Sequence, residues 1–288
     1  MNSNPVCASR PSVPRVRYGA LFTTIAASLL VASAAGAGDL ENIKARGKIV
    51  MLTFPAIEDP FVAVDVEAMR TLGLKLTGMT DPQHFHGVDV EIIKGFALKL
   101  GVKLEMHPET AGYGSLLPAL LKGTGDLVAS RLTITPKRQE AADFSMAYFT
   151  QWVVAAVRPD SPLKSVGDLK GKTVAVMTGS SQQEFLPALN LDPKIHPTTF
   201  NQESYTAVIE GEADYALMDS RAAVGEPVSA AFNGLKVGLH LRPSDQGIML
   251  RKGSNLKAPL DAYIEDLRAS GELVKILEKH GLAKASAK

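Results

Sequence analysis

A candidate anion-binding site lies within the segment SRLTITPKRQE. Thr135 followed by Pro136 predicts the start of a helix, because threonine caps helix N-termini and proline suits the first helical position. Arg138 then falls in the first helical turn, where the positive end of the helix dipole disfavours a cation. An arginine in this position indicates a nearby anion, and the hydroxyls of Ser130 and Thr133 can donate hydrogen bonds to the same anion.

The anion beside Arg138 has two interpretations. In one, Arg138 pairs with a surface acid of its own segment, such as Glu140 or Asp143. In the other, Arg138 follows a buried strand, predicted for residues 126–129, and binds the carboxylate of a small molecule. The pattern alone leaves both open.

A second candidate anion site follows a predicted strand and opens a predicted helix, within the sequence MTGSSQQE. Ser181 and Glu184 have the spacing of a capping box, which predicts that Ser181 caps the helix. Free backbone N–H groups at a helix start bind anions, and Ser180 and Ser181 would lie beside them. Capping and ligand binding are compatible, since a cap uses only part of the free N–H groups.

Two single residues complete the candidate site. Asp219 follows an apolar run, and the pattern alone is that of a helix N-cap. Tyr113 stands between Gly112 and Gly114, which is typical of a loop that approaches something closely. Its ring either contacts a ligand or packs on its own part of the protein.

The elements that must position these residues alternate between strands and helices. Strands are predicted at residues 48–53, 102–106, 152–157, 172–177, 195–200, 214–218 and 235–241, and helices at 88–100, 115–121, 181–189, 203–209 and 256–280. Such alternation predicts α/β domains with mainly parallel sheets. Residues 62–85 are predicted to form a loop-rich insertion without a clear period, because Gly73, Gly78 and Pro82 interrupt them.

The N-terminus has the pattern of a secretory signal. Three arginines precede an apolar stretch at residues 18–31 that ends in small residues, so cleavage is expected after Ala37. The alternative is an uncleaved membrane anchor, which Thr23 and Thr24 disfavour by diluting the apolar stretch. Cleavage removes Cys7, the only cysteine, and changes the formal net charge from +1 to +1 − 3 = −2.

Composition and motifs exclude several functions. A net charge of +1 without a basic block gives no case for nucleic-acid binding. The sequence has no Walker-type loop, no Gly-x-Ser-x-Gly elbow and no His-Glu-x-x-His motif. His84 and His86 have the spacing for two imidazoles on one face of a strand, but two ligands without a third are a weak case. We therefore expect no cofactor and no metal.

Several motifs in one order resemble the periplasmic solute-binding proteins that serve polar amino-acid ABC importers. The resemblance runs from about residue 43 to the end of the chain. It rests on the motifs TITPKR, DFSMAY, GVDVE, LLPAL, GDL, GKTVAV and ADYA, together with Phe61.

The resemblance implies an α/β fold of two lobes, each with a mainly parallel sheet flanked by helices. Lobe 1 would comprise residues 43–148 plus 246–288, and lobe 2 residues 149–245, with hinge crossings near 148–151 and 241–245. Arg138, Thr133 and the Ser180–Ser181 turn would hold the α-carboxylate of an amino acid, Asp219 its ammonium group, and Tyr113 its side chain. The implied protein is a periplasmic monomer that presents its ligand to an inner-membrane ABC permease.

Two residues depart from the family pattern. Glu58 stands where an aromatic residue is usual, and Arg131 where a small residue is usual. Either the two pair across the pocket, or Arg131 binds a second anionic group of the ligand. Both cast doubt on a simple neutral amino acid as the ligand.

Two other functions on the same scaffold stay open. One is a dehydratase acting on prephenate-like dicarboxylates, with Glu58 as general acid. The other is a sensor or accessory protein that binds a ligand and then docks on another exported protein. Because no motif demands catalysis, we expect a binding protein and not an enzyme.

Overall fold

The computed structural model describes residues 39–56, 59–223 and 234–282. The predicted signal segment, its cleavage site and Glu58 lie outside these ranges. Within them, none of the helices combines the length and the apolar character needed to cross a membrane.

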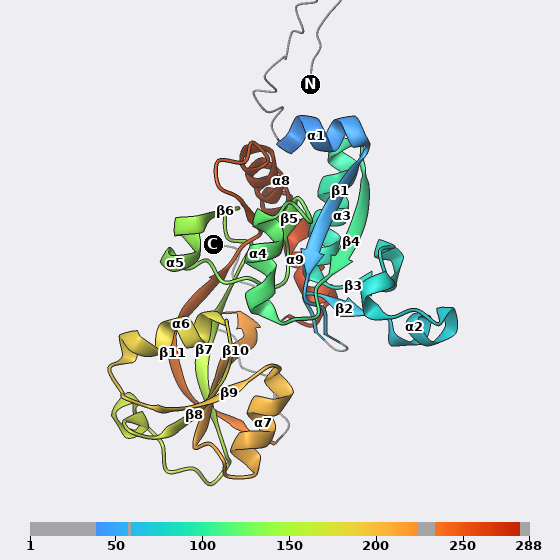
Figure 1. The fold of residues 1–288 in the computed structure, drawn as a ribbon. Coiled ribbons are helices and arrows are strands. Elements are labelled where there is room, and N and C mark those ends of the chain that lie inside the picture. Colours follow the sequence, from blue (N-terminus) through green and yellow to red (C-terminus); the bar gives the residue numbers. More distant parts are fainter. Residues whose placement is uncertain (1–38, 57–58, 224–233, 283–288) are drawn as a thin grey trace, which may run out of the picture. The chain divides into compact units, whose positions relative to one another are not determined.

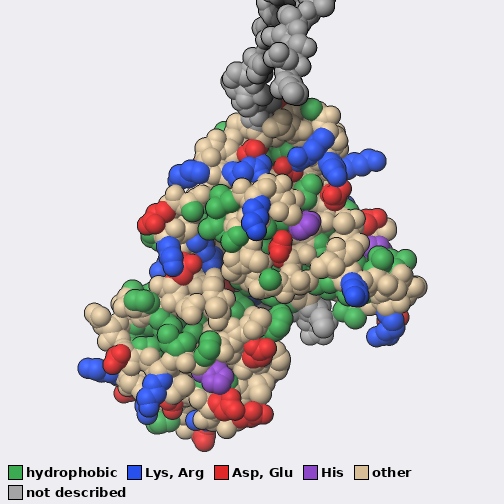
Figure 2. Space-filling model, viewed as in Figure 1, with side chains coloured by type: hydrophobic (Ala, Val, Ile, Leu, Met, Phe, Trp, Pro, Cys, Tyr) green, Lys and Arg blue, Asp and Glu red, His purple; other side chains and the backbone are tan. Residues whose placement is uncertain are grey.

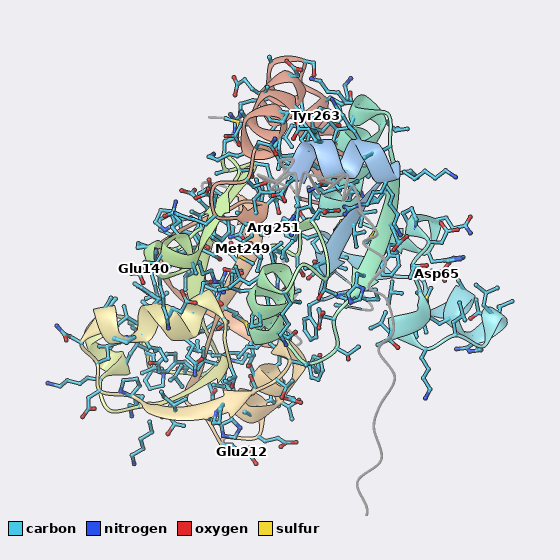
Figure 3. All side chains as sticks on the ribbon, turned by 45° about the horizontal axis from the view of Figure 1, so that its top comes forward. Asp65, Glu140, Glu212, Met249, Arg251 and Tyr263 are labelled. Atoms are coloured by element: carbon cyan, nitrogen blue, oxygen red, sulfur yellow. The ribbon has the colours of Figure 1, made fainter. Side chains whose placement is uncertain are left out.

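The first sheet has five strands in the order β4-β1-β5-β12-β6 (Figure 1). Strand β1 pairs in parallel with β4 and β5, whereas β12 pairs antiparallel with β5 and β6. The strand bounds are β1 Lys48–Thr53, β4 Lys103–Pro108, β5 Leu127–Val128, β6 Ala142–Phe144 and β12 Met249–Arg251. Met249 and Arg251 mark the position of β12 in Figure 3. The sheet is mixed, because β12 runs antiparallel to both of its neighbours.

Helices cover both faces of the first sheet. On one face, α3 packs against α8 and α9 and contributes Ile93 and Phe96 to a core that includes Met51 of β1. On the other face, α4 contributes Leu116 and Leu120 to a second core. The helices are α1 Asp39–Arg46, α3 Val88–Leu100, α4 Leu116–Leu121, α5 Pro136–Ala141, α8 Lys257–Ala269 and α9 Glu272–Lys279, with the 3-10 turn η3 Tyr113–Ser115 before α4.

Helix α3 shows how local sequence sets an element. It spans the predicted residues and ends at Gly101, whose φ of 71° is the left-handed conformation that glycine adopts without strain. It begins after Gly87, where a Cβ would lie 2.2 Å from the carbonyl oxygen of Phe61. Glycine is therefore required at this start, because any side chain would collide with the neighbouring backbone.

The second sheet has the order β11-β7-β10-β8-β9. Its strands are β7 Phe149–Val157, β8 Thr173–Met177, β9 Lys194–Thr198, β10 Tyr215–Ala223 and β11 Lys236–Gln246. Side chains of β10 alternate between two cores, with Met218 facing the core under α7 Asn201–Ile209 and Leu217 facing the core under η5 Leu186–Leu189. Both faces of this sheet are thus buried, as expected for strands that read as continuous apolar runs.

The chain changes sheets twice. It leaves the first sheet after β6, enters the second with β7, and returns between β11 and β12. The two connections touch, since Tyr148 N–H donates to the carbonyl of Gln246 at 3.0 Å. The predicted lobe boundaries at residues 148 and 246 stay a prediction.

Two predicted segments differ from the structure. The insertion at 62–85 is not only loop, because it contains β2 Ala63–Val64, α2 Val66–Leu72, the 3-10 turns η1 Leu76–Gly78 and η2 Pro82–His84, and the start of β3 Phe85–His86. Asp65 caps α2 and Gly73 ends it at a φ of 63°, so that glycine is a helix terminus (Figure 3). The helix predicted at 181–189 is α6 Ser181–Phe185 followed by η5, with Pro187 in the tighter turn.

The visible face of the described chain mixes both signs of charge. Figure 2 shows lysine and arginine interspersed with aspartate and glutamate, with apolar side chains between them. This agrees with the absence of a basic block in the sequence.

Candidate functional site

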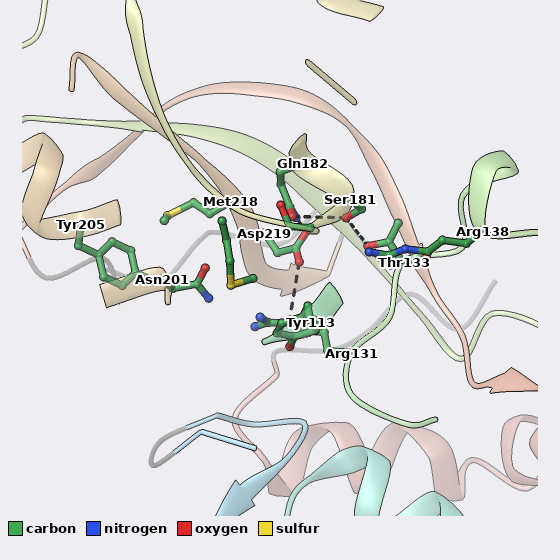
Figure 4. A pocket seen from close by; sticks show the side chains of 12 residues that line it. Tyr113, Arg131, Thr133, Arg138, Ser181, Gln182, Asn201, Tyr205, Met218 and Asp219 are labelled. Carbon is green, nitrogen blue, oxygen red and sulfur yellow. Dashed lines mark hydrogen bonds and ion pairs between the residues drawn. The ribbon is translucent and has the colours of Figure 1, made fainter. Parts of the chain in front are cut away.

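One pocket brings together residues from elements around both sheets (Figure 4). The elements that supply the lining are η3, the segment after β5, α5, the end of β8, the start of α6, α7 and β10. The lining residues are Tyr113, Arg131, Thr133, Arg138, Met177, Ser180, Ser181, Gln182, Asn201, Tyr205, Met218 and Asp219.

Arg138 lies in the first turn of α5, as the sequence predicts. Thr135 is the N-cap and accepts a hydrogen bond from the Arg138 backbone N–H at 3.2 Å, with Pro136 at the first helical position. The guanidinium donates from Nη1 to the carbonyl of Thr133 at 3.0 Å and from Nη2 to the carbonyl of Gly179 at 3.3 Å. Arg138 therefore joins α5 to the turn before α6.

The anion beside Arg138 is a protein carboxylate that the sequence did not indicate. Arg138 Nε lies 3.4 Å from Glu184 Oε1, and Thr135 Oγ1 donates to Glu184 Oε2 at 2.8 Å. Neither predicted local partner has this role, since Asp143 pairs with Lys252 at 3.0 Å and Glu140 is exposed on α5. Glu184 lies 46 residues further along the chain than Arg138, so a local sequence pattern could not predict this pair.

The start of α6 differs from the predicted capping box. Ser180, not Ser181, is the N-cap and accepts from the Gln183 N–H at 3.2 Å. The hydroxyl of Ser181 is thereby left for the pocket, where it donates to Thr133 Oγ1 at 2.9 Å. Thr133 Oγ1 also lies 3.1 Å from Ser244 Oγ, so these hydroxyls form one buried network.

Arg131 is buried in the pocket wall in an unusual backbone conformation. Its φ is 49°, and its side chain is 6% exposed. Nη1 donates to Asp59 Oδ2 at 3.0 Å, Nε lies 3.9 Å from Asp219 Oδ2, and the guanidinium lies 5.8 Å from the Phe61 ring centre. The predicted pair of Arg131 with Glu58 involves a residue outside the described ranges. In the structure, the carboxylate that pairs with Arg131 is that of Asp59.

Asp219 lies inside strand β10, where it pairs with Val153 of β7. The interpretation of Asp219 as a helix N-cap is therefore wrong, because the strand continues to Ala223 instead of giving way to a helix. Its Oδ1 accepts a hydrogen bond from Gln182 Nε2 at 2.7 Å, and its side chain is 9% exposed. This buried carboxylate faces the middle of the pocket in Figure 4.

Asp89, a fully buried carboxyl group, holds the backbone of Arg131, which forms part of the pocket wall. Its Oδ2 accepts the Arg131 N–H at 2.7 Å, and its Oδ1 accepts a hydrogen bond from the Tyr148 hydroxyl. Burial raises the pKa of Asp89 to about 7, against the opposite effect of its two hydrogen bonds. The same burial, with Asp89 beside it, raises the pKa of Tyr148 well above its ordinary value.

Tyr113 and Ser130 differ in their position relative to the pocket. Tyr113 lines the pocket, packs edge-on against Phe54 with ring centres 5.2 Å apart, and has its pKa raised by burial. Ser130 lies behind the lining, where its hydroxyl accepts the Phe54 N–H at 3.0 Å. Among the predicted site residues that the structure describes, Ser130 is the one outside the lining.

The sequence did not single out Gln182, Asn201, Tyr205 or the two methionines. Asn201 and Tyr205 are four residues apart on α7 and therefore lie on the same face of the helix. This spacing did not single them out in the sequence, because any amphipathic helix has residues at the same spacing. Gln182 directly follows the predicted serine turn and was within reach of the same argument. Among the described residues, the histidines and acids form no group of three that would hold a metal ion.

Two sheets, each covered by helices and joined by two connections, with a polar pocket lined from both, define the two-lobed fold of the type II periplasmic binding proteins. A solved structure of this class, the ancestral amino acid-binding protein AncCDT-1, a precursor of cyclohexadienyl dehydratase, matches with a TM-score of 0.70 at 28% identity. The match covers 84% of this chain and 99% of that one. The predicted two-lobed α/β fold is confirmed, whereas the sheets are mixed instead of mainly parallel, because β12 pairs antiparallel with β5 and β6 and β7 pairs antiparallel with β10 and β11.

The sequence matches a family across residues 75–283, more than half of the chain. The chain belongs to the bacterial extracellular solute-binding proteins, family 3, as the resemblance predicted. The arginine-binding extracellular protein ArtP of Bacillus subtilis is 30% identical over 67% of this chain and 76% of its own length. The L-glutamate/L-aspartate-binding protein of Pseudomonas aeruginosa is 26% identical over 92% of this chain and 88% of its own.

Proposed function

We propose that this chain is the substrate-binding protein of an ABC importer and that it closes two lobes over an amino acid or a related small carboxylate. The observation that carries the proposal is the pocket, where Arg138, Ser181 and Asp219 meet from α5, α6 and β10. The relatives support it, because they are named for the binding of arginine, or of glutamate and aspartate.

The pocket offers groups for both ends of an amino acid. Arg138 and the hydroxyls of Thr133 and Ser181 would hold the α-carboxylate, since all three are hydrogen-bond donors at one end of the pocket. Asp219, whose carboxylate is buried in the same pocket, would bind the ammonium group. A ligand held by both groups contacts elements of both sheets and so favours the closed arrangement.

The remaining parts of the proposal concern where the protein works. Residues 1–37 would direct export and be removed after Ala37, which places the mature monomer in the periplasm. There it would deliver its ligand to an inner-membrane permease. It would bind its ligand without converting it.

A ligand screen tests this proposal. Thermal shift of the full chain, purified after export, should show a rise in melting temperature with one class of amino acid, because a ligand that binds only the folded state stabilises it. Titration calorimetry would then give the affinity, and mass spectrometry the mature N-terminus. No shift with any amino acid or dicarboxylate would sink the binding function. Conversion of prephenate to phenylpyruvate would sink the proposal that the protein has no enzymatic activity.

A further inference from the structure

The pocket has two different ends. In Figure 4, Arg138, Thr133 and Ser181 lie at one end, whereas Asn201 and Tyr205 lie at the other. Asp219 lies between the two ends, and an ion-pair contact links it to Arg131 on the opposite wall. If the α-carboxylate binds at the Arg138 end and the ammonium at Asp219, the ligand's side chain extends toward Arg131, Asn201 and Tyr205.

The end that would receive the side chain is rich in hydrogen-bond donors. Arg131 carries a guanidinium, Asn201 an amide, and Tyr113 and Tyr205 a phenol each. Burial raises the pKa of Tyr113, which keeps its hydroxyl protonated at neutral pH. A group that accepts several hydrogen bonds suits this end better than an apolar or cationic one.

The guanidinium of Arg131 is fixed in place by the fold. Asp89 holds its backbone N–H, Phe61 lies under its planar group, and Asp59 accepts one hydrogen bond from Nη1. A guanidinium has five N–H donors in a fork that fits a carboxylate with two parallel bonds. Within the described residues its one side-chain hydrogen bond is the one to Asp59, because the Asp219 contact of 3.9 Å is too long for a second.

We propose that the ligand is an acidic amino acid, whose side-chain carboxylate binds Arg131. This inference rests on the proposed function and deepens it. The lining residues include two cations, Arg138 and Arg131, and the carboxylate of Asp219, which an ion-pair contact links to Arg131. An acidic amino acid has the complementary set of two carboxylates and one ammonium group. A basic amino acid would place its cationic side chain against Arg131, which like-charge repulsion opposes.

Asp59 competes with the ligand for Arg131. It offsets the positive charge of Arg131 in the ligand-free protein, so an incoming carboxylate must share the guanidinium with it. Asp59 thereby lowers the affinity for every acidic ligand while keeping the buried cation paired. Replacing Asp59 by asparagine should therefore tighten the binding of an acidic amino acid by several-fold.

Calorimetry with four ligands tests the proposal on the full exported chain. L-Glutamate or L-aspartate should bind at least tenfold more tightly than L-glutamine, and L-arginine should bind most weakly. Equal or tighter binding of L-arginine or L-glutamine would overturn the acidic ligand and leave the proposed function standing. Failure of every amino acid to bind would instead remove the proposed function itself.

Variants then tie the preference to Arg131. Arg131→Gln should weaken the binding of the preferred acidic amino acid at least tenfold, while L-glutamine binding changes less than threefold. Because this variant removes the cation that Asp59 contacts, the double variant Asp59→Asn with Arg131→Gln repeats the test with both members of this pair neutral. If the double variant still prefers acidic amino acids, Arg131 does not bind the side-chain carboxylate of the ligand. Should neither variant fold, the comparison of ligands on the unaltered chain decides alone.

Discussion

Arg138 and Arg131 line the same pocket, but the structure holds their guanidinium groups in different ways. Arg138 donates to two backbone carbonyls and has Glu184 at 3.4 Å, beyond a short hydrogen bond. Arg131 has a carboxylate, that of Asp59, at 3.0 Å, and a second aspartate, Asp89, accepts its backbone N–H. Their side chains are 11% and 6% exposed.

The difference concerns how much positive charge each arginine offers a ligand. Carbonyl oxygens orient a guanidinium without cancelling its charge, so Arg138 stays attractive to an anion. A close carboxylate offsets part of the charge of Arg131, so a ligand gains most there if it presents a well-placed carboxylate of its own. We infer that Arg138 contributes mainly affinity and Arg131 mainly selectivity.

The largest expected effect concerns the acid behind Arg131. Because the folded protein raises the pKa of Asp89 from 3.8 to about 7, folding favours its protonated form. Between these values the folded state binds one proton more than the unfolded state, so stability falls as the pH rises toward 7. From pH 5 to pH 8 the loss is about 3 kcal/mol, at ~1.4 kcal/mol for each unit of pKa difference. Asp89→Asn should remove this slope in denaturant unfolding.

A matched control is Asp143→Asn, in strand β6. The pKa of Asp143 is lowered by hydrogen bonds from the Gly253 N–H and Lys252, so its contribution is complete above about pH 4 and is lost only in acid. This variant should keep the wild-type slope between pH 5 and 8. The same slope in Asp89→Asn as in the wild type would exclude titration of Asp89 as its cause.

The sequence could predict the elements whose signals are local. Helix α3 ends at Gly101, and strand β1 spans the apolar run at residues 48–53. Both elements were therefore predicted with the bounds that the structure has. The two adjacent serines at the start of α6, Ser180 and Ser181, were not distinguishable as caps, because each has a polar residue three positions later. Strand β10 runs past Asp219 because β7 pairs with it, and no local pattern carries that information.

The site was predictable in its residue types but not in its pairings. Arg138, Thr133 and Asp219 line the pocket as the motifs indicated. The carboxylate on Arg138 and the one on Arg131 come from distant or unsuspected positions, Glu184 and Asp59. Only folding brings such partners together, so a sequence shows that a cation needs an anion but not which one it has.

The second expected effect tests the Arg138 side of the comparison. Arg138→Ala should weaken the binding of a carboxylate ligand about 30-fold, or ~2 kcal/mol, since it removes charged hydrogen bonds. Calorimetry measures the loss, and Lys137→Ala, which removes an exposed cation of the same helix, is the control. An equal loss in both variants would mean that only net charge matters. Unchanged affinity in Arg138→Ala would end its assignment as the carboxylate group.

The third effect has the opposite sign. Glu184→Gln removes the carboxylate that lies 3.4 Å from Arg138 Nε, so the guanidinium should attract an anionic ligand more strongly. We expect a gain of about fivefold in affinity, or ~1 kcal/mol, partly offset by the weaker hydrogen bond from Thr135. Glu140→Gln on the exposed side of α5 is the control (Figure 3). A loss of affinity in Glu184→Gln would show that Glu184 orients Arg138 instead of competing for it.

The smallest effect concerns an apolar contact next to two lining residues, since Phe54 packs on Tyr113 and Phe200 directly precedes Asn201. Phe200, which precedes α7 and is 48% exposed, stacks on Phe54 with ring centres 5.8 Å apart and an angle of 15°. Such a pair contributes about 0.5 kcal/mol or slightly more at a partly exposed site, so Phe200→Ala should weaken ligand binding about twofold. Ile195→Ala, with a side chain that is 52% exposed on β9, is the control. Because the contact carries no charge, the change in affinity should be the same at low and high salt, whereas the effect of Arg138→Ala should shrink as salt increases. A salt-dependent loss in Phe200→Ala would mean that the ring acts by placing the polar residue Asn201 beside it, and not through its apolar contact with Phe54.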